Sequence, residues 1–293
     1  MKQAILITAY KDFDQLCLLV DFFDQDFNIY IHVDKKSTIP EDLKSELTGK
    51  KNVKYLRQDY KVNWGGVNHL KSYLKLAEIS LHDVDNAFFH LISGQDYPIK
   101  NLKYFKRLAG ENKDNIKDYL AFRKMPKPDW HQGGMDRLEY YNLYDFFDAR
   151  KKWRKKIIQF LVDLQKKTGF KRPINRFPGQ LYGGSTYWSL SRATLQYVID
   201  YTRNNKHFSD GFKYTFCAEE IYFQTVILNS VRSGNVVNNN QRYVDWKTQR
   251  GGNPAFLDEG DFEMLMESNK IFARKIDGKR NGLLFMLRNY LIQ

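Results

Sequence analysis

The sequence predicts an α/β fold with a mostly parallel central sheet flanked by helices. Between residues 1 and 100, short apolar runs of strand length alternate with helical patterns, which is typical of such sheets. The most apolar run, Ala87–Ile92, is followed at once by the polar turn Ser93–Asp96. A strand that is apolar on both faces lies in the middle of a sheet, and ligands bind just beyond the carboxyl ends of such strands. We therefore expect a binding site after Ile92.

Composition narrows the class of protein. The chain has 293 residues, 42% of them hydrophobic, and a net charge of +13, so it can bury a sizeable core and should meet an anionic partner. Nucleic acid, a membrane surface and a nucleotide-bearing substrate all fit this charge. The two cysteines, Cys17 and Cys217, suit a reducing compartment, and we find neither a signal peptide nor a membrane-spanning run. We expect a cytoplasmic protein, with peripheral contact to the inner face of the membrane left open.

The first elements form a strand–helix–strand unit. Ala4–Thr8 and Asn28–Asp34 are the predicted strands, and Phe13–Phe23 has helical spacing; this order is the unit of a right-handed parallel sheet. Asp34 ends the second strand, where an acid can bond a ribose hydroxyl or a nucleobase edge. Asp34 could instead cap the next turn, and local context alone favours this cap over a nucleotide contact.

The next elements surround a glycine pair. A polar insert, Thr38–Lys51, leads to the predicted strand Val53–Leu56, and the helix Asn68–Leu81 opens after Gly65 and Gly66. Two glycines let backbone approach backbone or ligand closely. For Trp64, just before them, a core anchor is favoured over a wall of the ligand site.

The middle of the chain is basic and aromatic. Tyr140–Lys156 could bind nucleic acid or phospholipid head groups. We favour a solvated helix face instead, with a membrane role second. The reason is that the basic run is followed by apolar residues at helical spacing, which can supply the buried face of the helix: Ile157, Phe160, Leu161 and Leu164.

Two later segments carry candidate site residues. Gly179–Leu190 is a glycine-rich loop entering a strand, and its aromatic rings could support the apolar face of a sugar. Phe216–Leu228 is a predicted apolar helix with Glu219 and Glu220 in its first turn, where the helix dipole favours acids even as simple caps. The remaining predicted elements are helix Arg192–Thr202, strand Arg242–Trp246, helix Asp261–Ser268 and the segment Ile271–Asp277.

Four segments in register resemble a known family. Ser93–Lys100, Gly184–Trp188, Ala218–Thr225 and Phe272–Asp277 look like the core-2/I-branching β-1,6-N-acetylglucosaminyltransferases and the related peptide O-xylosyltransferases, with the resemblance running from Ile5 to Asp277. It implies a GT-A-type glycosyltransferase fold and inverting transfer from a UDP-sugar. We expect a single domain, with a nucleotide-binding half (1–100), an acceptor-binding and catalytic half (101–277) and an amphipathic C-terminal tail (278–293).

The resemblance also implies that no metal is required. Where most GT-A enzymes carry a metal-binding Asp-x-Asp, this chain reads Ser93-Gly94-Gln95. We interpret its Asp-x-Asp pairs, which lie elsewhere, as caps and surface acids; they are Asp12/Asp14, Asp24/Asp26 and Asp83/Asp85. Without a cation, fixed positive charge must stabilise the leaving diphosphate.

The resemblance assigns roles residue by residue. Glu220, five residues before Thr225, matches the family's general base, and Glu219 is then an acceptor contact or a cap. Lys275 matches the family lysine at the diphosphate; Arg250 is nominated as its arginine partner, with Arg274 as competitor. Further donor contacts are Asp34, Thr8 or Ala9, and Ser93. The acceptor contacts are Gly184, Ser185, Tyr187, Trp188, Tyr243, Trp246 and, as the weakest candidate, Arg137.

We therefore expect a metal-independent, inverting transferase that moves N-acetylglucosamine or xylose from UDP to a glycan or lipid-linked glycan in surface-polysaccharide synthesis. The animal enzymes have a membrane anchor and disulfides that this chain lacks, which suggests a bacterial relative. The segment Arg123–Phe177 does not match, so the acceptor stays open. The alternatives are a metal-dependent GT-A transferase and a basic nucleic-acid-binding protein. The enzyme is favoured over the latter because charge explains none of the four segments.

Overall fold

A seven-stranded sheet organises the molecule. The computed structural model describes residues 1–108, 116–174, 177, 179–278 and 281–291, and the strand order is β3-β2-β1-β4-β7-β6-β8. The strands are β1 (Lys2–Ala9), β2 (Phe27–Val33), β3 (Val53–Arg57), β4 (Asn86–Ser93), β6 (Asp118–Lys124), β7 (Tyr182–Ser191) and β8 (Val236–Val237).

The sheet is mostly parallel, as predicted. β1 pairs in parallel with β2 and β4, β2 with β3, and β6 with β8. β7 runs antiparallel to both β4 and β6. The central strand β4 is buried along almost its whole length, and it ends at Ser93, where the sequence places the expected site.

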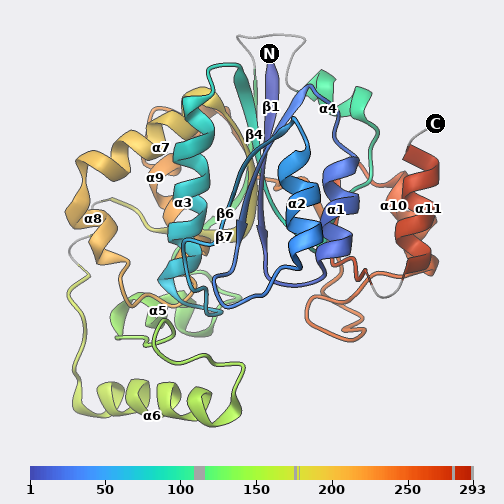
Figure 1. Cartoon of the computed structure of the whole chain (residues 1–293). Coiled ribbons are helices and arrows are strands. Elements are labelled where there is room, and N and C mark those ends of the chain that lie inside the picture. Colours follow the sequence, from blue (N-terminus) through green and yellow to red (C-terminus); the bar gives the residue numbers. More distant parts are fainter. Residues whose placement is uncertain (109–115, 175–176, 178, 279–280, 292–293) are drawn as a thin grey trace.

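Helices cover both faces of the sheet (Figure 1). One face packs against α3 (Val67–His82), α7 (Arg192–Asn204) and α9 (Tyr222–Leu228), and the other against α1 (Phe13–Asp21), α2 (Glu41–Gly49), α10 (Phe262–Glu267) and α11 (Asn281–Leu291). The remaining α-helices of the described residues are α4 (Leu102–Leu108), α5 (Asp136–Glu139), α6 (Lys152–Thr168) and α8 (Lys206–Gly211). We did not predict α2, because only Leu47 of this charged segment is buried.

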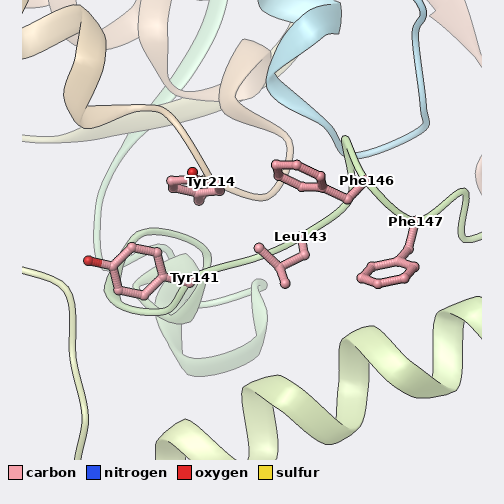
Figure 2. A pocket seen from close by; sticks show the side chains of 5 residues that line it. All are labelled: Tyr141, Leu143, Phe146, Phe147 and Tyr214. Atoms are coloured by element: carbon pink, nitrogen blue, oxygen red, sulfur yellow. The ribbon is translucent and has the colours of Figure 1, made fainter.

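The basic helix α6 lies apart from the sheet, near the end where β1 and β4 finish (Figure 1). Only Ile158 of this helix is buried. The prediction that Phe160 and Leu164 belong to its buried face is wrong, because both are exposed. Beside α6 is an open, apolar pocket of about 410 Å³ (Figure 2). It is lined by Tyr141, Leu143, Phe146, Phe147 and Tyr214.

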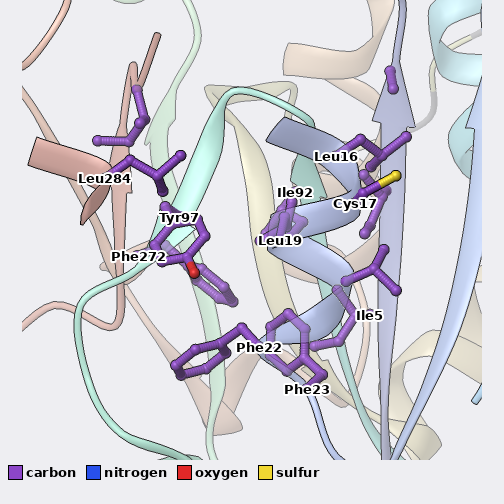
Figure 3. Close-up of a cluster of buried hydrophobic side chains, with 14 of the residues drawn as sticks. Ile5, Leu16, Cys17, Leu19, Phe22, Phe23, Ile92, Tyr97, Phe272 and Leu284 are labelled. Atoms are coloured by element: carbon purple, nitrogen blue, oxygen red, sulfur yellow. The ribbon is translucent and has the colours of Figure 1, made fainter. Parts of the chain in front are cut away.

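The larger apolar core lies between α1 and the sheet (Figure 3). Leu16 and Leu19 of α1, and Phe23 just after it, belong to the same buried cluster as Ile5 and Ile92 of the sheet. Burying each such side chain contributes about 1.5–3 kcal/mol relative to exposure. The apolar residues of the strands and of the helix Phe13–Phe23, which we predicted to be buried, therefore form part of the core.

A small second sheet brings the C-terminal segment to the end of β4. Its strand order is β5-β10-β9, with β5 (Asp96–Pro98), β10 (Phe272–Arg274) and β9 (Arg242–Val244). β10 pairs antiparallel with β5 so that Arg274 stands opposite Asp96. Residues far apart in the sequence thereby become neighbours at the expected site.

The C-terminal tail packs on the core. Leu283, Leu284, Leu287 and Leu291 of α11 are buried in the cluster beneath α1. The leucines of the expected amphipathic tail are therefore used in the fold, while residues 279–280 and 292–293 of this tail lie outside the described residues. No helix in the described ranges has the length and apolar character needed to cross a bilayer. Cys17 and Cys217 are both buried and free.

Candidate active site

Three side chains meet where β4 and β10 end and β5 begins. The Ser93 hydroxyl donates to Asp96 Oδ2 at 2.6 Å and accepts from Arg274 Nη1 at 2.5 Å. The same Asp96 oxygen accepts the Ser93 backbone N–H at 2.6 Å and pairs with Arg274 at 3.2 Å. Asp96 is fully buried and holds Ser93 and Arg274 in position. It lies in the first of the four resembling segments, but no local pattern indicated a role for it.

The end of β1 lies beside this cluster. The Gly94 N–H donates to the Thr8 carbonyl at 2.9 Å, and a Cβ on Gly94 would lie 3.3 Å from the Cβ of Ala9. A side chain at position 94 would thus force the two segments apart. Thr8, Ala9 and Ser93, nominated separately, are brought together.

Two lysines approach the same aromatic ring near the end of β1. The ammonium groups of Lys275 and Lys11 lie 5.5 and 5.7 Å from the ring centre of Phe256. Lys11 pairs with Asp12 at 2.8 Å, whereas no carboxylate of the described residues lies within 4.0 Å of Lys275. Burial, and then the charges of Arg274 and Lys11, lower the pKa of Lys275. This is a region of unbalanced positive charge that favours an anion.

Arg274, and not Arg250, accompanies Lys275. The Arg250 guanidinium pairs with Asp258 at 2.5 Å and with Asp261 at 2.6 Å, so two carboxylates already balance its charge. Its backbone carbonyl accepts the N–H of Phe256 at 2.8 Å. Arg250 therefore fixes the loop that carries the Phe256 ring. This arrangement favours Arg274 as the partner of Lys275, and a diphosphate contact by Arg250 stays a prediction.

Asp34 acts as a cap, the role that local context favoured. Its Oδ1 accepts the backbone N–H groups of Lys36 and Val62, each at 3.0 Å, and the Lys36 amine lies 3.6 Å from Oδ2. The Asp34 N–H donates to the Ala9 carbonyl at 2.9 Å, which keeps the ends of β2 and β1 together. A donor contact by this residue stays a prediction.

The two glutamates precede α9 rather than starting it. They lie in the short 3₁₀ helix η3 (Ala218–Glu220), and Ile221, with φ −123° and ψ −37°, separates it from α9. The single predicted helix Phe216–Leu228 is therefore wrong at its start. The residues just before η3 pack on the Gly65 turn: Gly65 has φ +81° and accepts the Cys217 N–H at 3.0 Å, and a Cβ there would meet the Phe216 ring at 2.5 Å.

Glu220 is held by an arginine and stays accessible. Its Oε2 accepts from Arg137 Nη1 at 2.6 Å, and the Arg137 guanidinium stacks 3.7 Å above the Trp130 ring. The Glu220 side chain is 28% exposed. Burial, and next the neighbouring Glu219, raise the pKa of Glu220, while Arg137 opposes this shift. A carboxylate with a raised pKa and one oxygen bound by a fixed cation is suited to accept a proton.

Glu219 faces inward instead. It is 3% exposed and hydrogen-bonds His69 Nδ1 at 3.0 Å, while His69 Nε2 lies 2.7 Å from the Tyr73 hydroxyl. His69 and Tyr73 are one turn apart on α3. Glu219 thus contacts the interior rather than an acceptor. Sequence reasoning missed both partners, although their spacing of four on an otherwise apolar helix face was a usable signal.

Tyr187 connects the glutamates with the basic side. Arg274 lies 4.8 Å from the centre of its ring. Burial raises the pKa of Tyr187, Arg274 opposes the shift, and Asp96 and Glu219 add to it. The charges of Arg274 and Glu219 therefore both act on this one buried hydroxyl.

The other nominated acceptor residues do not gather around Glu220. Trp188 is fully buried and packs 5.1 Å from Phe223, so its nomination is wrong. The Tyr243 hydroxyl donates to Met264 of α10 at 2.6 Å, whereas Trp246 is exposed on a loop. Gly184 serves strand pairing, because a Cβ there would overlap the carbonyl oxygen of the paired strand β6.

Two further predictions concern Ser185, a proposed acceptor contact, and Trp64, a proposed core residue. The Ser185 hydroxyl accepts from Asn240 at 2.7 Å, which ties β7 to the segment before β9. Trp64 is 55% exposed and lies edge-on to Phe216. The core role that we favoured for Trp64 is wrong, and an exposed wall near the glutamates is what remains.

The Asp-x-Asp acids are engaged elsewhere. Asp12 pairs with Lys11, and Asp24 and Asp26 both pair with Lys106. Across the part of the chain that the structure describes, no three His, Cys, Asp or Glu side chains form a group that could hold a metal ion.

Comparison with known proteins identifies the family. The profile of the Core-2/I-Branching enzyme family matches residues 4–264. The chain belongs to this family. The predicted family is thereby confirmed; three of the four short segments lie within the matched residues, and Phe272–Asp277 lies beyond them. The expected α/β class, with a mostly parallel sheet flanked by helices, is what the structure has.

Curated relatives of the chain are xylosyltransferases. It is 25% identical over 257 residues to xylosyltransferase 1 of Mus musculus and 27% identical over 240 residues to xylosyltransferase 2 of Homo sapiens. These matches cover 83% and 80% of this chain but 23% and 25% of the relatives, so the chain spans about a quarter of their length. A solved structure of S. aureus TarS 1-349 matches with a TM-score of 0.37 and 14% identity over 80% of this chain and 57% of that one.

Proposed function

We propose that this family member transfers a sugar, xylose or N-acetylglucosamine, from a UDP donor to a hydroxyl of a glycan acceptor, with inversion and without a metal. The observation that carries the proposal is an accessible glutamate, Glu220, held by Arg137, in a chain that also places Lys275, without a described carboxylate within 4.0 Å, next to Arg274 at the end of β10. The xylosyltransferase relatives support xylose as one donor sugar.

In the proposed reaction, Glu220 is the general base. Its free carboxylate oxygen takes the proton of the acceptor hydroxyl as that oxygen attacks the anomeric carbon. The bond from this carbon to the donor phosphate oxygen breaks on the opposite side, which inverts the configuration. A single displacement needs no carboxylate nucleophile, in keeping with Glu219 being bound to His69. Arg137 holds the other oxygen of Glu220 and so orients the base.

The leaving UDP gains negative charge that must be stabilised. Lys275 and Lys11 lie over the Phe256 ring, and Arg274 is fixed by Ser93 and Asp96. Charge-assisted hydrogen bonds from such groups are about twice as strong as neutral ones. Three cations from the chain are our proposed substitute for a divalent ion at the diphosphate.

The experiment is a thermal-shift titration with a panel of UDP-sugars, run in EDTA and again with Mn²⁺. The proposal expects a UDP-dependent rise in melting temperature of the same size under both conditions. Dependence on Mn²⁺ would favour the metal-dependent transferase. Salt-sensitive retention on RNA or DNA without any response to UDP would favour the nucleic-acid-binding alternative.

We further propose surface-polysaccharide synthesis as the setting, with a lipid-linked glycan as acceptor and the inner face of the cell membrane as the location. The net charge of +13 supports an anionic surface as a partner. Transfer from the UDP-sugar to soluble and to lipid-linked glycans, compared at equal concentration, tests this acceptor. Preference for the soluble glycan would contradict it.

A further inference from the structure

The helix α6 carries an apolar row that nothing in the described structure covers. Trp153, Phe160 and Leu164 are 58%, 66% and 46% exposed. They follow one another at spacings of seven and four, with Ile157 between them, so they share one face of the helix. The buried Ile158 lies on a different side, where it packs with Tyr144 and Ala149. α6 is therefore apolar on two sides, and only one of them is used in the fold.

Two other helices of the described residues, α7 and α11, do not have this feature. In α7, the apolar positions Leu195, Val198 and Ile199 are all buried. In α11, four leucines are buried and Phe285 and Tyr290 are exposed. The row on α6 places three large side chains in solvent on a single helix face, including a tryptophan. Exposed apolar sets bordered by polar groups mark interaction surfaces.

The charges beside the row indicate what covers it. α6 contains six lysines and arginines and one aspartate, and none of its basic groups pairs with a carboxylate of the described residues. Lys156 precedes Phe160 by four positions and Lys167 follows Leu164 by three, so both amines border the row. Each is exposed. A helix with Trp, Phe and Leu on one face and lysines at its border fits the interface of an anionic bilayer, where rings enter the acyl boundary and amines meet head groups.

The position of α6 connects this surface with the proposed site. Figure 1 shows α6 at the end of the molecule where the carboxyl ends of β1 and β4 lie. The segment that leads into α6 contacts the site directly: Tyr144 stacks 4.6 Å from Phe216, and Asp145 accepts from the Val67 N–H at the start of α3. The apolar pocket of Figure 2 opens between this segment and Tyr214. A bilayer touching α6 would thus face the Glu220 end of the molecule.

We propose that α6 is a membrane-docking surface, in which Trp153, Ile157, Phe160 and Leu164 insert into an anionic bilayer and the bordering lysines bind its head groups. The inference rests on the proposed function for one point only, the lipid-linked acceptor that docking would bring to the site. Docking itself concerns no residue of the proposed catalytic or donor-binding groups.

The test is sedimentation of the full chain with vesicles of phosphatidylcholine mixed with phosphatidylglycerol, and with phosphatidylcholine alone. Wild type should bind the mixed vesicles, be released by high salt, and leave pure phosphatidylcholine vesicles unbound. Trp153→Ser with Phe160→Ser should lower binding at least about tenfold, because the inserted area is lost. Lys152→Glu with Lys156→Glu and Lys167→Glu, all along one border of the row, should lower it at least about a hundredfold, since each surface lysine contributes about fivefold.

Matched variants keep the result specific to α6. Phe285→Ser with Tyr290→Ser removes two exposed rings from α11, and Lys51→Glu with Lys71→Glu and Lys103→Glu reverses three exposed charges elsewhere. Both should bind vesicles as wild type does. Loss of binding in the α11 variant but not in the α6 variants would overturn the proposal. Failure of the wild-type protein to sediment with anionic vesicles would overturn it as well.

A second copy of the chain is the competing occupant. Light scattering that finds a wild-type dimer, split by Trp153→Ser with Phe160→Ser, would also overturn membrane docking. The UDP-dependent melting shift is measured on the same variants. If vesicle binding fails while this shift remains, only the docking surface is wrong; if UDP has no effect on wild type, the proposed function fails instead.

Discussion

The basic side and the acid side of the candidate site balance their charges differently. On the acid side, Glu220 pairs with Arg137, and Glu219 hydrogen-bonds His69. On the basic side, Lys275 has no described carboxylate within 4.0 Å and shares the Phe256 ring with Lys11. An uncompensated cation near other cations is unfavourable unless an anion binds it. The difference indicates that the basic side awaits an anionic ligand, whereas the acid side is already arranged for proton transfer.

The largest expected effect is on the acid side. Glu220→Gln removes the proton acceptor and keeps the shape, so transfer should fall by about 10²–10⁴-fold while UDP affinity stays at the wild-type value. Turnover is measured by UDP release and affinity by calorimetry. Glu263→Gln, on the exposed side of α10, is the matched control. A Glu220→Gln enzyme that keeps a tenth of its turnover would remove this residue from the mechanism.

The next effect is on the basic side. Lys275→Ala should weaken UDP binding about 10–100-fold, the range expected for losing a hydrogen bond to a charged group. Lys270→Ala, five residues earlier and without an ion pair among the described residues, is the control. Equal UDP affinity in both variants would mean that the diphosphate lies elsewhere. Together with Glu220→Gln, this pair of variants separates binding from chemistry.

The pH dependence tests how the acid side is arranged. The transferase needs ionised Glu220, so kcat/KM should fall as pH drops through the raised pKa of this residue. Arg137 opposes that increase, so Arg137→Ala should raise the pKa further and move the acid limb to higher pH, by about one unit. Arg123→Ala serves as a control for the loss of one positive charge nearby in the chain. An acid limb that stays in place would show that Arg137 does not tune the base.

A smaller effect is expected at Lys11. Its charge is already compensated by Asp12 at 2.8 Å, so Lys11→Ala should weaken UDP binding only about threefold, in the range of a partly exposed ion pair. Calorimetry on Lys11→Ala and Lys275→Ala side by side provides the comparison. If Lys11→Ala proves the more damaging change, Lys11 rather than Lys275 is the main diphosphate contact.

The smallest effect is expected at Arg250. Because Asp258 and Asp261 already hold its guanidinium, Arg250→Ala should leave UDP affinity within about twofold and lower stability by about 1 kcal/mol or less. Calorimetry and thermal unfolding measure these separately. A loss of UDP affinity as large as that of Lys275→Ala would restore Arg250 as the diphosphate partner.

Local patterns predicted the strands and helices of the first 100 residues well, because their apolar runs are buried in the core. The same patterns placed Phe160 and Leu164 inside, since spacing shows that apolar side chains share a face but not what covers that face. α2 was missed because it buries one residue. Likewise, the chain that enters η3 is bonded to Gly65, a contact that is remote in sequence.

The site was predicted unevenly for a related reason. Glu220, Lys275 and Ser93 lie in short segments whose order resembles the family. Asp96 and His69 act through partners far along the chain: Arg274 in one case and Glu219 in the other. Trp188 follows the partly exposed residues 184–186 of β7, but from Tyr187 onward every residue of this strand is buried. Contacts between distant segments determine these roles, and no local pattern encodes them.

The central claim is that cations of the chain itself bind the donor diphosphate. Calorimetric titration of UDP into wild type and Lys275→Ala, both in EDTA, tests it most directly. We predict that wild type binds UDP without any divalent ion and that the variant binds it at least about tenfold more weakly. Binding that appears only when Mn²⁺ is added, or that is the same in the two proteins, would contradict the claim.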